Sequence, residues 1–207
     1  MSGDAGAAAA DAGAGAAGTG AGAAAPSGRI RLARREDVPR LLAIYAPFVL
    51  RTPVTFETEV PGEEAFWERV RGVLAHAPWL VHEAPDGDIA GYAYAARHRE
   101  RAAYGWCVEP SVYVADRHRR RGVARALYGR LLDLLRRQGF RHAYAGITLP
   151  NEASVALHEA LGFRLLATYR SVGYKLGAWR DVGWWELGLG QGSAPEAPRT
   201  PAEVAAG

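Results

Sequence analysis

All aromatic residues of the chain lie in one interval, and this confines the hydrophobic core to that interval. Residues 29–189 contain all 6 Trp, 9 Tyr and 5 Phe. Residues 1–28 contain 13 Ala and 8 Gly and no aromatic residue, so they cannot bury enough apolar surface to offset the loss of chain entropy. Residues 190–207 are similarly poor in large apolar residues and rich in Pro. We therefore expect one domain at 29–189, flanked by two disordered tails.

Composition excludes several classes of protein. No apolar run reaches the roughly 18 residues that a membrane span needs. The first basic residue is Arg29, so the beginning of the chain does not resemble a signal peptide, and we expect a cytoplasmic protein. Because Cys107 is the only cysteine, an intrachain disulfide is excluded, and the 6 His lack metal-motif spacing. We expect no metal site.

Hydrophobic periodicity changes repeatedly along the interval. Helical spacing predicts helices over about 37–52, 63–76, 123–138 and 151–161. Alternating or continuous apolar runs predict strands over about 30–32, 79–83, 89–96, 104–114, 142–148, 163–174 and 179–189. This order of elements predicts a mixed α/β sheet with helices on both faces.

The segment Arg119-Arg120-Arg121-Gly122-Val123-Ala124 joins a predicted strand to the strongest predicted helix. Free backbone N–H groups at a helix start attract anions, and Gly122 and Ala124 let the backbone approach a pyrophosphate closely. The segment is therefore a candidate phosphate site. Two alternatives remain, an ordinary turn with a solvated basic flank and a nucleic-acid patch formed by Arg117–Arg121.

Further motifs follow in order along the chain, and they carry a family resemblance. They lie at 108–114 (VEPSVYV), 149–154 (LPNEAS), 157–163 (LHEALGF) and 173–183 (GYKLGAWRDVG). With the Arg119 loop, they resemble the phosphinothricin acetyltransferase subfamily of the GNAT N-acetyltransferases over about residues 29–189. The resemblance implies the GNAT fold: a central mixed, mostly antiparallel twisted sheet of about seven strands, splayed in the middle, with four helices on its two faces.

The resemblance also implies chemistry. Acetyl-CoA would be the co-substrate, and the α-amino group of a small amino-acid-like acceptor, such as phosphinothricin or methionine sulfoximine, would receive the acetyl group directly. Glu109 matches the general base, because a carboxylate can take the amine's proton directly or through water. His158 stands where many relatives have a tyrosine that protonates the departing thiolate. The alternatives are a structural carboxylate and a packed histidine.

The expected acetyl-CoA contacts follow from the same match. The backbone of three β-strand residues would bind the pantetheine arm, and an arginine-rich loop would bind the pyrophosphate. The side chain of Asn151 would contact the CoA arm, unless Asn151 is only a helix cap. The strand residues are Val112, Tyr113 and Val114, and the loop residues are Arg119, Arg120, Arg121, Gly122, Val123, Ala124 and Arg125.

The basic loop before the catalytic strand is the expected acceptor site. Arg99 and Arg101 suit an acceptor carboxylate or phosphinate, and Tyr104 would line the pocket. The remaining expected acceptor residues are Glu100, Glu109, Pro110 and Ser111. The alternative is a solvated hairpin loop.

The resemblance further implies a homodimer whose pockets meet at the subunit interface, with no nucleic-acid or membrane partner. Rival functions are an acetyltransferase for another amine, such as a protein N-terminus, a basic nucleic-acid-binding module, and a CoA sensor without catalysis.

Overall fold

A computed structural model describes residues 26–191 and 196–205 of the chain. The expected disordered segment at 1–28 lies almost entirely outside these residues. Among the described residues, no helix is long and apolar enough to cross a membrane.

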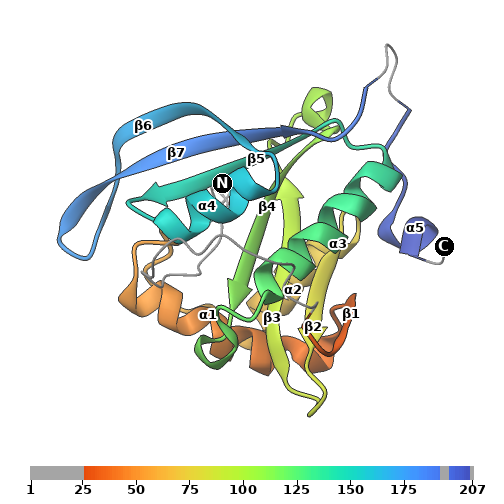
Figure 1. Ribbon diagram of the computed structural model, residues 1–207, viewed down its shortest axis with the longest axis horizontal. Helices are drawn as coiled ribbons and strands as arrows, with labels where there is room; N and C mark the ends of the chain where they lie inside the picture. Colours follow the sequence, from red (N-terminus) through yellow and green to blue (C-terminus); the bar gives the residue numbers. More distant parts are fainter. Residues whose placement is uncertain (1–25, 192–195, 206–207) are drawn as a thin grey trace.

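One sheet of seven strands forms the centre of the molecule, in the order β1-β2-β3-β4-β5-β7-β6 (Figure 1). The pair β4–β5 is parallel and every other neighbouring pair is antiparallel. The strands are β1 (Arg29–Leu32), β2 (Trp79–Glu83), β3 (Ile89–Arg97), β4 (Cys107–Val114), β5 (His142–Leu149), β6 (Arg164–Lys175) and β7 (Ala178–Gly188). The predicted mixed and mostly antiparallel sheet is confirmed.

Helices cover both faces of the sheet (Figure 1). On one face, α1 (Val38–Arg51) and α2 (Glu63–Leu74) pack Leu41, Phe66 and Val70 into a cluster with aromatic residues of β2, β3 and β4. On the other face, α3 (Val123–Gln138) buries Leu127, Leu131 and Leu135 completely, and α4 (Glu152–Ala160) packs beside it. These apolar stripes have the helical spacing seen in the sequence, which is why the four helices were predictable.

One predicted boundary differs from the structure. Strand β4 begins at Cys107 rather than Tyr104, because Ala102–Tyr104 form a single 3-10 turn.

At the C-terminal end, the described residues 196–205 pack against the domain. Pro201–Ala205 form a short helix, α5, and the side chain of Val204 is only 2% exposed within the core cluster around α3. The backbone N–H of Arg199 donates to the carbonyl of Gln138 at 2.8 Å. One buried valine and specific hydrogen bonds thus place this segment on the domain, although its composition is that of a tail, and the disorder expected over 190–207 stays a prediction.

Candidate active site

Strands β4 and β5 separate soon after they begin, and this divergence defines the site. They pair only at Cys107 with His142 and at Val108 with Ala143, after which β4 stays with β3 and β5 stays with β7. The 3.3 Å bond from His98 N to Cys107 O marks a hydrogen-bonded pair of the β3–β4 ladder. By the alternation of antiparallel ladders, Pro110 then faces β5, where its missing N–H removes a donor. The splaying in the middle of the sheet, which the family resemblance implies, therefore has a direct cause at Pro110.

The same alternation shows which backbone groups of β4 face the divergence. Ala115 N bonds Ala90 O at 2.9 Å, so Tyr113 is hydrogen-bonded to β3 while Val112 and Val114 direct their N–H and C=O groups toward β5. Tyr113 instead places its ring in the core, 5.0 Å from the ring of Tyr45. Of the three expected backbone contacts, Val112 and Val114 therefore fit an added strand-like ligand, and Tyr113 does not.

The loop before α3 has the backbone of an anion site. Gly122 caps the helix at φ 79°, a left-handed conformation that a side chain would strain. The N–H groups of Val123, Ala124 and Arg125 begin the helix and have no acceptor within it. Because β4 leads into this loop, these donors lie at the diverging end of β4 and β5.

The arginines of this loop divide into two groups. Arg119 forms an ion pair with Asp116 at 2.7 Å and lies 5.3 Å from the ring centroid of Phe48. Arg117 likewise forms an ion pair with Asp88. Arg120 and Arg121 are exposed and form no ion pair with any described residue, as is also true of Arg125. An anion can therefore recruit these three, whereas a phosphate patch spanning Arg117–Arg121 would require breaking two ion pairs.

Asn151 acts as the cap of α4. Its Oδ1 accepts the backbone N–H of Ser154 at 3.1 Å, and the residue is 8% exposed. The capping alternative is therefore confirmed. A further contact with the CoA arm remains a prediction.

Glu109 lies in the middle of the sheet at the start of the divergence. Its side chain is only 2% exposed, and Oε1 accepts two hydrogen bonds, one from His98 Nδ1 at 2.7 Å and one from Arg99 Nη1 at 3.0 Å. His98 reaches it because position 98 lies diagonally across the β3–β4 hairpin on the same face. The charge of the buried carboxylate is thus matched by a guanidinium and an imidazole N–H.

Aromatic rings from three other elements surround His98. The ring centroid of Tyr144 (β5) lies 4.8 Å away, that of Tyr104 5.8 Å away and that of Trp184 (β7) 6.3 Å away. Tyr104 lies at the site as expected from the sequence, whereas no local sequence signal indicates His98, Tyr144 or Trp184. The missed signal is strand register, since the Cys107–His142 pairing puts Glu109 and Tyr144 on one face.

The structure brings only part of the predicted acceptor loop to Glu109. Arg99 and Tyr104 lie there, the former with a half-exposed side chain. Glu100 and Arg101 are exposed, and neither forms an ion pair with any described residue. Ser111 is completely buried on the same face as Glu109, and its Oγ has no hydrogen-bond partner among the described residues.

His158 lies in the core, away from this arrangement. Its Nδ1 donates to the carbonyl of Ser154 at 2.7 Å, so Nε2 accepts from the Tyr128 hydroxyl at 3.1 Å. Burial lowers the pKa of His158 to about 4, so the ring is neutral at pH 7 and has no proton on Nε2 to give. The geometry therefore supports the packed-histidine alternative over the expected proton donor.

Comparison with known proteins agrees with this fold and site. Residues 30–184 match the family model described as an acetyltransferase (GNAT) domain, so the chain belongs to the GNAT acetyltransferase family and is an N-acetyltransferase. It is 41% identical over 157 residues to phosphinothricin N-acetyltransferase of Streptomyces viridochromogenes, covering 76% of this chain and 85% of that protein. It is 36% identical over 170 residues to the L-methionine sulfoximine/L-methionine sulfone acetyltransferase of Salmonella typhimurium, covering 81% of this chain and 98% of that protein.

A solved structure agrees as well. The phosphinothricin acetyltransferase of Sinorhizobium meliloti, determined in complex with acetyl-CoA, superposes with a TM-score of 0.78 at 32% identity, covering 82% of this chain and 94% of that one. The resemblance inferred from the sequence motifs is confirmed.

The buried His158 predicts a specific pH dependence of stability. The unfolded chain binds a proton on this residue below about pH 6.5 and the folded chain only near pH 4, so the free energy of unfolding falls between these values as pH falls. The loss attributable to His158 is about 3 kcal/mol. Urea unfolding at pH 6.5 and pH 4 should show a smaller loss for His158→Gln, whose amide can still accept from Tyr128. Equal losses in the two proteins would contradict the buried neutral histidine.

Proposed function

We propose that this N-acetyltransferase moves the acetyl group of acetyl-CoA to the α-amino group of a small amino-acid-like acceptor. The observation that carries the proposal is Glu109, a buried carboxylate where β4 and β5 diverge, on the strand that leads to a helix start with free N–H groups. The relatives named for phosphinothricin and methionine sulfoximine indicate the acceptor class.

Acetyl-CoA fits the residues along the divergence. Val112 and Val114 offer N–H and C=O groups to the amides of an extended arm, as in the addition of a strand to a sheet edge. The first-turn N–H groups of α3, with Arg120, Arg121 and Arg125, suit its pyrophosphate. The bound thioester supplies the acetyl group.

The acceptor fits the side of the sheet that carries Glu109 and Arg99. Arg99 has a half-exposed guanidinium that can bind a carboxylate or phosphinate in a bidentate manner. The rings of Tyr104, Tyr144 and Trp184 offer apolar walls to the acceptor's side chain.

Glu109 removes the proton that blocks the reaction. The α-amine of an amino acid is mostly protonated at neutral pH and becomes a nucleophile only when that proton leaves. The two donors hold the carboxylate in one orientation toward the amine. We expect the fixed carboxylate to remove the proton faster than bulk water does. We assign the role of general base to Glu109 and no proton-donating role to His158.

The decisive experiment measures release of the CoA thiol by the wild-type protein and by Glu109→Gln. The panel contains phosphinothricin, methionine sulfoximine, ordinary amino acids, polyamines and short peptides. We expect turnover with a small amino-acid analogue and a drop of about 10²–10⁴-fold in kcat for the variant. Acetyl-CoA affinity, measured by calorimetry, should be nearly unchanged, because the glutamine keeps the shape of the side chain.

Glu68→Gln is the matched control, since among the described residues this exposed side chain of α2 forms an ion pair only with Arg71 on its own helix. It should retain wild-type turnover. Release of the CoA thiol with peptides alone would instead favour a protein N-terminus as the acceptor. No release with any small amino-acid analogue contradicts the proposed acceptor class, and near-wild-type turnover of Glu109→Gln contradicts the proposed base.

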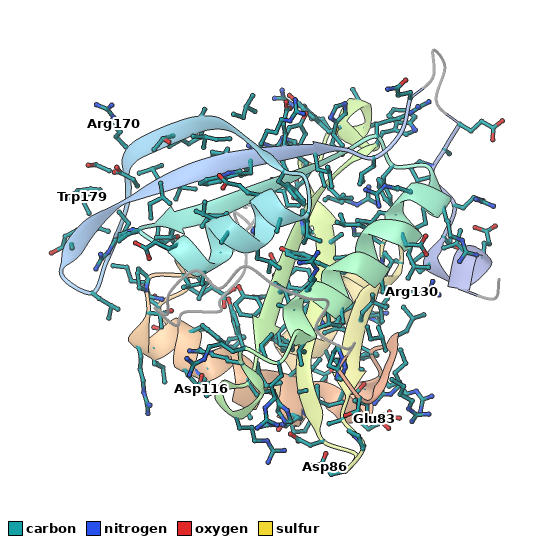
Figure 2. The ribbon with its side chains drawn as sticks, in the orientation of Figure 1. Glu83, Asp86, Asp116, Arg130, Arg170 and Trp179 are labelled. Atoms are coloured by element: carbon teal, nitrogen blue, oxygen red, sulfur yellow. The ribbon has the colours of Figure 1, made fainter. Side chains whose placement is uncertain are left out.

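A homodimer is the second part of the proposal, and the β6–β7 hairpin is its candidate interface. The hairpin extends from the body of the molecule, and Arg170 and Trp179 project from it (Figures 1 and 2). Large apolar side chains that are at least half exposed follow it: Leu165, Leu166, Tyr169, Val172, Tyr174, Leu176 and Trp179. A second copy of the chain would cover this apolar surface.

Sedimentation equilibrium should give twice the chain mass of 22.2 kDa. Charges placed on the hairpin by Leu166→Glu and Tyr169→Glu should give the monomer mass. Leu50→Glu, on the exposed side of α1, is the control that should leave the dimer intact. A wild-type monomer, or a hairpin variant that remains dimeric, argues against this interface.

A further inference from the structure

His98 is hydrogen-bonded to the buried Glu109 and is itself less buried. The Glu109 side chain is 2% exposed, and that of His98 is 16% exposed. The imidazole is therefore more accessible than the carboxylate to which it is bonded.

The hydrogen bonds fix the tautomer of His98. The Glu109 carboxylate accepts from Nδ1 at 2.7 Å, so Nδ1 carries the proton and Nε2 carries the lone pair. Among the described residues, Nε2 has no hydrogen-bond partner. A lone pair of this kind is the group that a general base needs.

The charges around His98 keep it in this state. Burial, together with the neighbouring Arg99, lowers the pKa of His98 from its usual value, so the ring is neutral at pH 7. The other groups that face it are Glu109 from β4, Tyr104 from the 3-10 turn and Tyr144 from β5. Of these groups, the carboxylate is the one that can stabilise an imidazolium once a proton arrives.

Oε1 of Glu109 already accepts two hydrogen bonds. The donors are His98 Nδ1 at 2.7 Å and Arg99 Nη1 at 3.0 Å, so His98 is joined to the carboxylate by a direct hydrogen bond. The neutral imidazole bonded to this carboxylate has a proton affinity suited to general-base catalysis near neutral pH.

We propose that His98 is a catalytic residue that accepts the acceptor's ammonium proton at Nε2 and passes its Nδ1 proton to Glu109. This proposal rests on the proposed function and specifies the proton path within it. One N–H bond of the ammonium breaks as the Nε2–H bond forms, and the Nδ1–H bond breaks as the Oε1–H bond forms. The amine is left with its lone pair, His98 is neutral in the other tautomer, and Glu109 is a neutral acid that remains the final proton acceptor.

The alternative is that His98 only orients Glu109, and one substitution separates the two roles. In His98→Asn the side-chain amide can donate to Glu109 from nearly the position of Nδ1, but nothing replaces Nε2. With the acceptor that the wild-type protein uses best, we expect kcat to fall about 100-fold or more while acetyl-CoA affinity changes less than about threefold. Added imidazole should restore part of kcat in the variant.

Glu68→Gln, whose exposed side chain forms an ion pair with Arg71 on its own helix, serves again as the control. It should retain wild-type kcat. If His98→Asn keeps kcat within about threefold of wild type, the proton relay is overturned. Absence of turnover in the wild-type protein would instead overturn the proposed function, so the two failures are distinguishable.

A second measurement does not depend on the variant folding. Nitrogen-15 NMR of the His98 ring in the wild-type protein at pH 7 should find the proton on Nδ1 and none on Nε2. A proton on Nε2 at that pH would overturn the relay as well.

Discussion

The separation of β4 from β5 is the constraint on which the rest of the site depends. Pro110 cannot donate a hydrogen bond toward β5, and pairing between the two strands stops at Val108 and Ala143. The hydrogen-bonding groups of Val112 and Val114 are therefore left for a ligand, while Tyr113 still ties β4 to β3. A sheet that paired fully would have no place for an extended co-substrate arm.

Glu109 is held at this point of the sheet at an electrostatic cost that its neighbours offset. A buried carboxylate is unfavourable unless it is hydrogen-bonded and its charge is matched. His98 and Arg99 supply the hydrogen bonds and the matching charge. Both residues lie directly after β3, in the segment that connects β3 to β4. The contacts that stabilise the charge also define the direction from which an acceptor amine can approach it.

Much of the fold could be predicted because its signals are local. The apolar stripes of the helices, Gly122 before α3 and Asn151 before α4 are all visible within a few residues of sequence. His98, Tyr144 and Trp184 were missed because their proximity to Glu109 depends on the register between strands that are distant in sequence. The surroundings of His158 depend equally on long-range packing, which buries the ring and brings it to the hydroxyl of Tyr128. The docking of residues 196–205 on α3 depends on one valine in a segment of otherwise featureless composition.

The central claim is that the unpaired edge of β4 receives acetyl-CoA beside Glu109. Amide hydrogen exchange, resolved by residue with and without acetyl-CoA, tests it most directly. Bound acetyl-CoA should slow exchange at Val112 and Val114, whereas Tyr113, already bonded to β3, should change little. Unchanged exchange at both valines under saturating acetyl-CoA would show that the co-substrate does not bind along β4.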